Sequence, residues 1–310
     1  MQLRQLQYFI RIVEEGSISR ASQSLHVAQP ALSQQVNHLE AELGVKLLLR
    51  SVRGVTPTAA GTAVYQQAQR VLRQVESTRI IAIQANTGPA GPVALGLPWT
   101  VASVIGLNML AEVKAILPGI QLEIFEGPSS FLANLLARGK LDLAVVFDDT
   151  TDGGLELRPV VSEPLLFVGP AKTLTGISSI TPTQIATYPL LLLSRPNGIR
   201  ETLQRIWANE NVQPSIAAEI NAPRLLIDAV QFGMGYSVLP SCGLGEALSA
   251  ERIDAVPITD SRLRRTIYLG TSRLYGQSMA AESILALVER LILEAPVTEQ
   301  WSASSEIYPS

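Results

Sequence analysis

The stretch that decides the fold of the N-terminal part of the chain is Gln29-Pro-Ala-Leu-Ser-Gln-Gln-Val-Asn-His-Leu-Glu-Ala-Glu-Leu43. Its apolar residues recur at intervals of four, three and four, which places them on one face of a helix: Leu32, Val36, Leu39 and Leu43. The opposite face carries uncharged side chains that donate and accept hydrogen bonds: Gln29, Ser33, Gln34 and Asn37. Pro30 suits the first turn, where its missing N–H group costs nothing. The stretch therefore predicts a helix with one buried face and one polar face.

Two shorter helices are predicted upstream of this stretch. An apolar stripe that starts at Leu3 ends near Gly16, a natural helix stop. Ser17 or Ser19 can cap a second helix, which a tight turn at 26–28 joins to the long one. A short helix joined so closely to a helix with a polar face is typical of a helix-turn-helix motif. We therefore expect the polar face to contact base edges in a major groove of DNA.

A wing is predicted downstream of this recognition helix. Gly44 can end the helix, and the runs 45–50 and 52–56 can pair as a short hairpin. Its arginines are expected beside the phosphate backbone. We assign residues 1–58 to this winged domain and predict these DNA-contacting residues: Gln29, Pro30, Ser33, Gln34, Asn37, Arg50 and Arg53.

Charge and length divide the chain. Residues 1–87 hold nine Lys and Arg against five Asp and Glu, whereas the remainder holds fifteen against twenty-two. A small basic module on an acidic body favours focused DNA binding over non-specific coating. At 310 residues and 47% apolar, the chain is long enough for several domains.

The sequence contains no run of the about 18 apolar residues that a membrane span requires, and no signal-peptide core follows Arg4. We therefore expect a cytoplasmic protein without a membrane partner, and a reduced structural thiol at Cys242, the single cysteine.

Residues 59–88 are predicted to form a linker helix that pairs two copies of the chain. Residues 58–87 hold no proline and only one glycine, Gly61. Its apolar residues keep a mainly three-and-four spacing: Val64, Ala68, Val71, Leu72, Val75, Ala82 and Ile83. A helix of this length spans about 45 Å, and so long and narrow a stripe is typical of a coiled-coil pair. An ordinary core helix is the alternative. Gly88-Pro-Ala-Gly-Pro92 then marks a domain boundary.

Beyond this boundary, strand and helix patterns alternate, which predicts a body of two α/β lobes at residues 89–294. The strand candidates are 93–97, 120–126, 139–147, 165–168, 190–193, 216–220, 236–239 and 266–270. Helices are expected between them, and a last one at 279–293. We assign lobe I to about 91–163 and 267–294, lobe II to about 164–266, and a flexible tail to 295–310.

Residues 1–61 resemble the N-terminal domain of LysR-type transcriptional regulators. The resemblance is carried by runs that include Leu6-Gln-Tyr-Phe9, Ala28-Gln-Pro-Ala-Leu-Ser-Gln-Gln-Val36 and Thr56-Pro-Thr58. Within the family, Gln29-Pro-Ala-Leu-Ser-Gln-Gln35 and Arg53-Gly-Val-Thr-Pro-Thr58 most closely resemble the nitrogen assimilation control subgroup. Leu48, Leu49 and Pro57 differ from the family pattern, but each replaces one apolar residue with another. We expect these exchanges to alter packing rather than the role of the wing.

The resemblance implies the fold class of the whole chain. It comprises an all-α-type winged helix-turn-helix domain, a long linker helix and a two-lobed α/β effector domain that resembles type 2 periplasmic binding proteins. The markers in the body are Gly139-Lys-Leu-Asp142 and Gly233-Met-Gly-Tyr-Ser-Val-Leu-Pro240. The implied partners are double-stranded promoter DNA, RNA polymerase, a second copy in a homodimer and further copies in a homotetramer.

A small organic effector is expected in the cleft between the lobes. The family alignment places the cleft at Thr100, Ser103, Ser129, Ser130, Phe147, Arg195, Asn197 and Met234. Thr100 and Ser129 can offer hydroxyl and N–H groups to an anion at helix starts, and Arg195 can clamp a carboxylate. The nitrogen assimilation subgroup implies an alternative, a regulator that needs no effector and acts through its own abundance.

An enzyme is the less favoured alternative. Both histidines, His26 and His38, lie in the DNA-binding part, so the acidic body has none for a Ser-His-Asp triad or a histidine metal site. Gly233 and Gly235 lack the third glycine of a dinucleotide motif. The acidic cluster at 148–152 is interpreted as a solvated turn, so no metal and no cofactor are predicted. A binding protein whose helix-turn-helix mediates protein contacts is a further alternative, which predicts no salt-dependent affinity for DNA.

Overall fold

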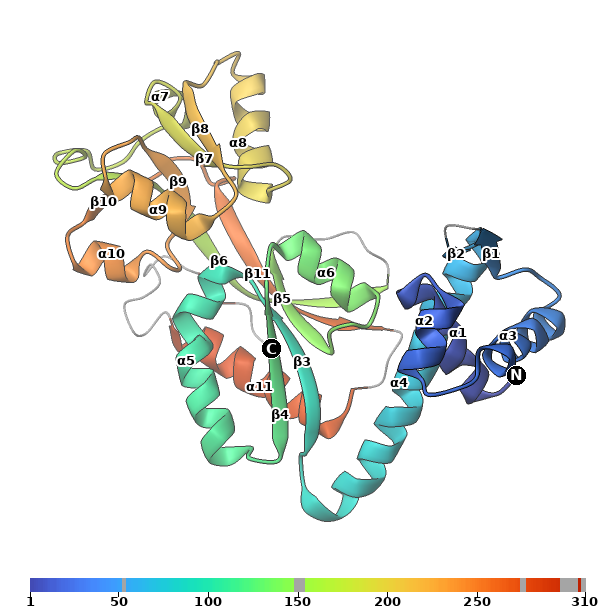
Figure 1. Ribbon diagram of the computed structural model, residues 1–310. Helices are drawn as coiled ribbons and strands as arrows, with labels where there is room; N and C mark the ends of the chain where they lie inside the picture. The colour runs from blue at the N-terminus through green and yellow to red at the C-terminus, as the bar shows by residue number, and fades with distance from the viewer. Residues whose placement is uncertain (52–53, 148–153, 274–276, 296–305, 308–310) are drawn as a thin grey trace. The chain divides into compact units, whose positions relative to one another are not determined.

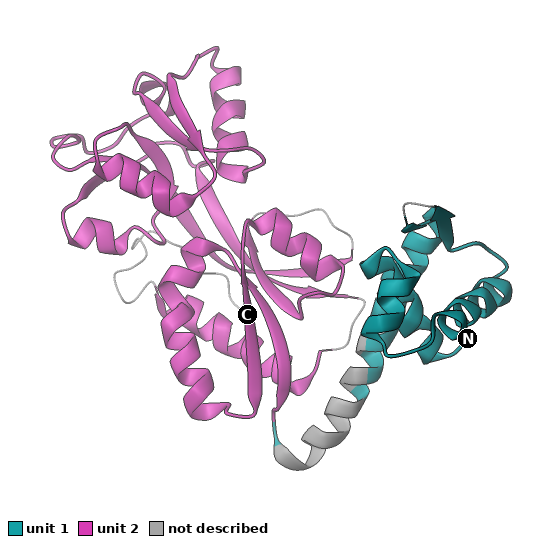
Figure 2. Cartoon of the chain, in the orientation of Figure 1, with its two compact units in different colours: residues 1–88 teal, residues 89–310 magenta. Residues whose placement is uncertain are grey.

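The chain forms two compact units, Met1–Gly88 and Pro89–Ser310 (Figure 2). The computed structural model describes residues 1–51, 54–147, 154–273, 277–295 and 306–307. Arg53 and the acidic cluster at 148–152 lie outside the described residues, as does most of the predicted tail.

Unit 1 is a helical domain with a two-stranded wing (Figure 1). Gly16 ends the first helix in the left-handed conformation, at φ 61°, and Ser17 rather than Ser19 caps the second. The wing is shorter than predicted, and its first strand begins at Leu48, where the N–H groups of Leu47 and Leu48 donate to the Glu40 carboxylate. The elements are α1 (Leu3–Glu15), α2 (Ile18–Ser24), α3 (Gln29–Leu43), β1 (Leu48–Ser51), β2 (Gly54–Pro57) and α4 (Ala59–Thr87).

The first part of α4 belongs to the core of unit 1. Ala68 is 2% exposed, and Val64 and Val71 pack partly buried against the same apolar cluster as Phe9 of α1. The first part of the stripe therefore packs inside unit 1, as in the alternative of an ordinary core helix. Pairing of the helix with a second copy stays a prediction, and the side chains of Ala82 and Ile83 lie outside the described residues.

Unit 2 contains an eight-stranded sheet with the order β10-β6-β11-β5-β3-β4, and with β9 and β12 (Glu306–Ile307) paired to β6. In its first lobe, alternate residues of each strand point to opposite faces. Leu143 and Val145 join the cluster under α5 and α11, whereas Ala144 and Val146 join the cluster under α6. The elements of this lobe are β3 (Gly91–Leu97), α5 (Trp99–Ile116), β4 (Ile120–Glu126), α6 (Ser129–Ala137), β5 (Leu143–Phe147) and α11 (Met279–Glu294).

The second lobe repeats this plan. Leu190 and Leu192 of β7 pack on the side of α7 and α8, while Leu191 packs on the side of α9 and α10. The elements are α7 (Pro182–Ile185), β7 (Leu190–Leu193), α8 (Gly198–Asn209), β8 (Ile216–Ile220), α9 (Pro223–Gln231), β9 (Ser237–Pro240), α10 (Gly245–Ser249) and β10 (Ile253–Pro257).

Two strands connect the lobes, β6 (Leu155–Pro170) and β11 (Arg264–Ser272), which run antiparallel to each other (Figure 1). The predicted strand 165–168 is only the distal part of β6, and β10 was not predicted. Pro159 and Pro164 hide the rest of β6 from a sequence pattern, because proline lacks the N–H group of a ladder residue. A register shift between Ile267 and Tyr268, which lies opposite Pro159, accommodates the first of them.

Helix α5 is long and apolar enough to cross a membrane by length and composition, and it is the single helix of that kind among the described residues. Here it packs in an α/β lobe, where Val101, Ile105 and Met109 are buried against the sheet.

Candidate functional site

The polar face of α3 forms a continuous surface. Leu32, Val36 and Leu39 are fully buried on the opposite face, which fixes the rotation of the helix about its axis. This rotation exposes four of the predicted DNA-contacting residues and leaves Ser33 half-buried beside them: Gln29, Pro30, Gln34 and Asn37.

Arg50 of the wing lies over this surface. Its Nη1 donates to Ser33 Oγ at 3.1 Å, and its Nη2 donates to Asn37 Oδ1 at 2.9 Å. The two acceptors are one helical turn apart, so the guanidinium spans the turn. Arg50 is therefore part of the recognition face as well as of the wing.

The buried carboxylate of Glu40 fastens the end of α3 to the wing. Its Oε1 accepts from Leu47 N at 2.9 Å and from Leu48 N at 3.1 Å, and its Oε2 accepts from Lys46 Nζ at 2.7 Å. Burial raises the pKa of Glu40, but these hydrogen bonds and the charge of Lys46 outweigh burial and hold the pKa below its usual value. The ionised carboxylate thus stabilises the position of the wing relative to the recognition helix.

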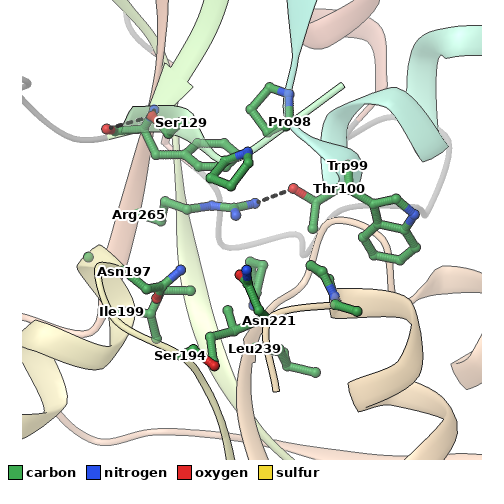
Figure 3. Close-up of a pocket in the computed structure, with 18 of the residues that line it drawn as sticks. Pro98, Trp99, Thr100, Ser129, Ser194, Asn197, Ile199, Asn221, Leu239 and Arg265 are labelled. Carbon is green, nitrogen blue, oxygen red and sulfur yellow. Dashed lines mark hydrogen bonds between the residues drawn. The ribbon is translucent and has the colours of Figure 1, made fainter. Parts of the chain in front are cut away.

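A pocket of about 700 Å³ lies between the two lobes of unit 2 (Figure 3). The first residues of four helices line it, from α5 and α6 in one lobe and α8 and α9 in the other. Of these four, only α8 has a side-chain cap, from Asn197. First-turn N–H groups without caps are hydrogen-bond donors for a ligand, and the helix dipoles favour negative charge there.

Apolar side chains make most of the remaining wall. Trp99, Phe147 and Ile199 line it together with several prolines. Three charged side chains at the lining are exposed: Glu126, Glu201 and Arg224. Such a mixture of apolar wall and few polar groups suits a small organic molecule better than an inorganic ion.

A buried ion pair stands at this pocket where β6 and β11 cross between the lobes. Arg265 and Glu163 are paired in register, and both are buried. Arg265 Nε donates to Glu163 Oε1 at 2.9 Å, and Arg265 Nη2 donates to the same oxygen and, at 3.3 Å, to Thr100 Oγ1. The guanidinium carbon lies 3.8 Å from the ring centroid of Phe147, a cation–π contact.

The other carboxylate oxygen of Glu163 extends this network into the second lobe. Glu163 Oε2 accepts from Ser241 Oγ at 3.1 Å and from Cys242 N at 2.9 Å, just after β9. The Cys242 thiol in turn donates to Thr100 O at 3.1 Å. One hydrogen-bonded network therefore joins the start of α5, both crossing strands and the loop after β9, and the cation–π contact adds the end of β5.

The structure brings five of the eight predicted cleft residues to the pocket: Thr100, Ser129, Ser130, Phe147 and Asn197. Ser129 Oγ accepts from Phe147 N at 2.8 Å, so this hydroxyl already holds the end of β5. The other three are not part of the described lining. Ser103 Oγ donates back to Thr100 O, Arg195 is exposed beside the lining residue Pro196, and Met234 is 67% exposed.

Sequence reasoning missed several lining residues, of which Arg265 is the most significant. Its signal was a pair of arginines, Arg264 and Arg265, directly before the predicted strand 266–270. A buried charge in a strand is rare and needs a partner. The partner, Glu163, lies about a hundred positions away in sequence, so only the strand pairing identifies it.

Both units of the chain match models of known protein families. Residues 3–62 match the model of the bacterial regulatory helix-turn-helix protein, lysR family, and residues 86–292 match the LysR substrate binding domain. The chain belongs to the LysR family of transcriptional regulators. It is therefore a sequence-specific DNA-binding regulator with an effector-binding domain, and not an enzyme.

Curated relatives of this LysR-type regulator include two nitrogen assimilation regulatory proteins nac. The protein from Klebsiella aerogenes is 34% identical over 95% of this chain and 97% of its own length. The protein from Escherichia coli K12 is 32% identical over 98% of this chain and all of its own length. The resemblance predicted from the two motif runs is thereby confirmed.

Solved structures confirm the predicted fold class of this LysR-type regulator. A full-length OxyR variant from Pseudomonas aeruginosa superposes with a TM-score of 0.73 at 24% identity, covering 98% of both chains. Full-length CbnR complexed with its target DNA superposes with a TM-score of 0.63 at 21% identity, covering 95% of this chain and all of that one. At these identities the likeness establishes the fold alone.

Proposed function

We propose that this regulator binds promoter DNA through α3 and the wing, and that a small organic ligand between the lobes of unit 2 changes that binding. The observation that supports the ligand most strongly is the pocket itself, which lies where β6 and β11 cross between the lobes. The proposed DNA contacts are Gln29, Pro30, Ser33, Gln34, Asn37, Arg50 and Arg53, of which Arg53 lies outside the described residues.

The ligand contacts both lobes at once in this proposal. Thr100, Ser129 and Phe147 belong to the first lobe, and Asn197 belongs to the second. To these predicted residues we add Arg265, since it lines the pocket and bonds to Thr100. A ligand shifts the regulator between two arrangements only by as much as its affinity for the two differs. A pocket that spans two lobes supplies such a difference whenever the lobes move.

We propose that the regulator is cytoplasmic and binds DNA as a homodimer. Two dimers then associate into a homotetramer, and the DNA-bound protein contacts RNA polymerase. Exposed apolar side chains support an interface with a second copy. Leu107 and Leu110 share one face of α5, and Leu225 and Phe232 share one face of α9 and its cap. Leu107 is 84% exposed and Phe232 is 82% exposed, an unfavourable state for a soluble surface unless a partner covers it.

A regulator that needs no effector is the second candidate, and one observation favours it. The hydroxyls of Thr100 and Ser129 already bond to Arg265 and Phe147, and Glu163 neutralises Arg265. The polar end of the pocket is thus satisfied by the protein itself. In this case DNA binding is controlled by the amount of protein.

A footprint of the full-length protein on DNA upstream of its own gene distinguishes the two candidates. The measurement uses two salt concentrations, with and without a panel of organic acids and amino acids. A protected site that shifts or shortens with one compound supports a ligand switch. Protection that no compound changes supports control by abundance, and affinity that does not fall with salt contradicts DNA contact through α3 and the wing.

A further inference from the structure

The bonds of Arg50 determine which hydrogen-bonding groups the recognition face offers to DNA. We infer that Arg50 is a positioning residue that turns Ser33 and Asn37 toward hydrogen-bond donation, and thereby sets the base preference of the regulator. The inference rests on the proposed contacts of Ser33 and Asn37 with bases. It gives Arg50 a role in specificity, beyond the phosphate contact predicted from its place in the wing.

The orientation of the Asn37 amide follows from elementary chemistry. A guanidinium has only donors, so the atom that faces Arg50 Nη2 at 2.9 Å is the amide oxygen. The Asn37 Nδ2 group, with its two N–H donors, therefore points away from Arg50. Without Arg50, the amide of this exposed side chain is free to rotate and to present either group.

Ser33 is oriented by the same guanidinium. Its Oγ accepts from Arg50 Nη1 at 3.1 Å, which leaves the hydroxyl proton to be donated elsewhere. Ser33 and Asn37 are four residues apart, so they lie one above the other on the same face of α3. Arg50 fixes both at once because its two terminal nitrogens form a rigid fork.

A donor surface selects among bases. In the major groove, guanine offers two acceptors, N7 and O6, and thymine offers O4, whereas adenine is best bound by an asparagine that donates and accepts together. A positive guanidinium on Asn37 Oδ1 weakens that oxygen as an acceptor for a base amino group. We therefore expect guanine or thymine acceptors at the base pairs that Ser33 and Asn37 contact.

The test measures base preference and salt dependence separately. The full-length protein selects its site from random duplexes, and affinity is then measured for that duplex and for each single base-pair substitution. The variants are Ser33→Ala, Asn37→Ala, Arg50→Ala and Arg50→Lys. The control is Arg11→Ala, which removes an exposed arginine whose ion-pair partners, Glu14 and Glu15, lie on its own helix.

We expect the Arg50 variants to lose base discrimination at the same positions as the Ser33 and Asn37 variants. Arg50→Ala and Arg50→Lys reduce discrimination about tenfold at the same base pairs as Ser33→Ala or Asn37→Ala, within the range of a good side-chain–base pair. In the Arg50 variants, affinity rises for duplexes that carry adenine at the base pair that Asn37 contacts. Arg50→Lys keeps the positive charge, so its salt dependence stays that of the wild type. Arg50→Ala combined with Asn37→Ala loses no further discrimination there, because both act through one amide.

Three outcomes overturn the inference. If Arg50→Ala weakens all duplexes equally and lowers the salt slope by about one, Arg50 contacts only a phosphate. If the Arg50 variants reduce discrimination at base pairs where Ser33→Ala and Asn37→Ala have no effect, Arg50 contacts a base directly. If the Arg50 variants match the Arg11→Ala control, it has no role in binding. If neither Ser33→Ala nor Asn37→Ala changes base discrimination, the proposed base contacts are contradicted instead. The failure of the inference about Arg50 is thus distinguished from the failure of the proposed DNA contacts.

Discussion

The ion pair between Arg265 and Glu163 is the residue-scale feature on which the pocket depends. Removing one partner leaves the other charged and buried, which costs about 3–5 kcal/mol. We expect Glu163→Leu or Arg265→Met to destabilise unit 2 by that amount in urea unfolding of the full chain. The double variant Glu163→Leu with Arg265→Met removes both charges and is expected close to the wild type. A double variant destabilised by the sum of the two single losses would show that the two charges do not depend on each other.

Glu40 gives a second residue-scale prediction, which concerns pH. Its folded pKa lies below its usual value, so ionised Glu40 stabilises the fold above pH about 4.5, and this stabilisation is lost as pH falls through the lower folded value. Glu40→Gln is expected to destabilise unit 1 by about 1–3 kcal/mol at pH 7, and the deficit narrows below pH about 4.5. Unfolding between pH 7 and pH 3 measures both. Glu42→Gln, on the exposed part of α3, is the control and is expected within about 0.5 kcal/mol of the wild type. A deficit that stays constant with pH would contradict the role assigned to the ionised carboxylate.

At the scale of elements, Gly61 sets how closely α4 approaches the segment before the wing. A Cβ on Gly61 would lie 1.9 Å from the Leu47 carbonyl oxygen, a backbone atom that accepts from Thr58 N. We expect Gly61→Ala to destabilise unit 1 by on the order of 3 kcal/mol, because the helix and the segment must separate. The matched control is Gly106→Ala on α5, where nothing lies within 4 Å of the new Cβ. That variant is expected to stabilise unit 2 by roughly 0.5–1 kcal/mol through helix propensity. Equal effects of the two substitutions would exclude close packing as the cause.

At the scale of the whole molecule, the exposed apolar face of α5 predicts self-association. Leu107→Asp with Leu110→Asp is expected to lower the mass measured by sedimentation equilibrium and to weaken DNA binding, because charges on a covered apolar face oppose burial. Asn108→Asp adds a charge to the same helix at an exposed polar position and serves as the control. An unchanged mass for the double variant would place the interface elsewhere.

The sequence by itself determined those features that depend on residues close together in the chain. The recognition helix, the glycine stops at Gly16 and Gly44, and the alternation of strands with helices follow from local spacing and from local backbone preferences. The predicted polar face of α3 needed only the rotation that Leu32 and Val36 impose.

Only the tertiary structure decided the features that join distant segments. The pairing of β6 with β11 sets Glu163 beside Arg265 at the pocket, and no local pattern predicts a contact across about a hundred residues. The tertiary structure also places Arg50 over Ser33 and Asn37, whereas the sequence predicted only a phosphate contact for this arginine. The first half of the α4 stripe likewise joined the core of unit 1. The physical reason is the same in each case: spacing shows which side chains share a face, whereas the partner of that face depends on how the whole chain packs.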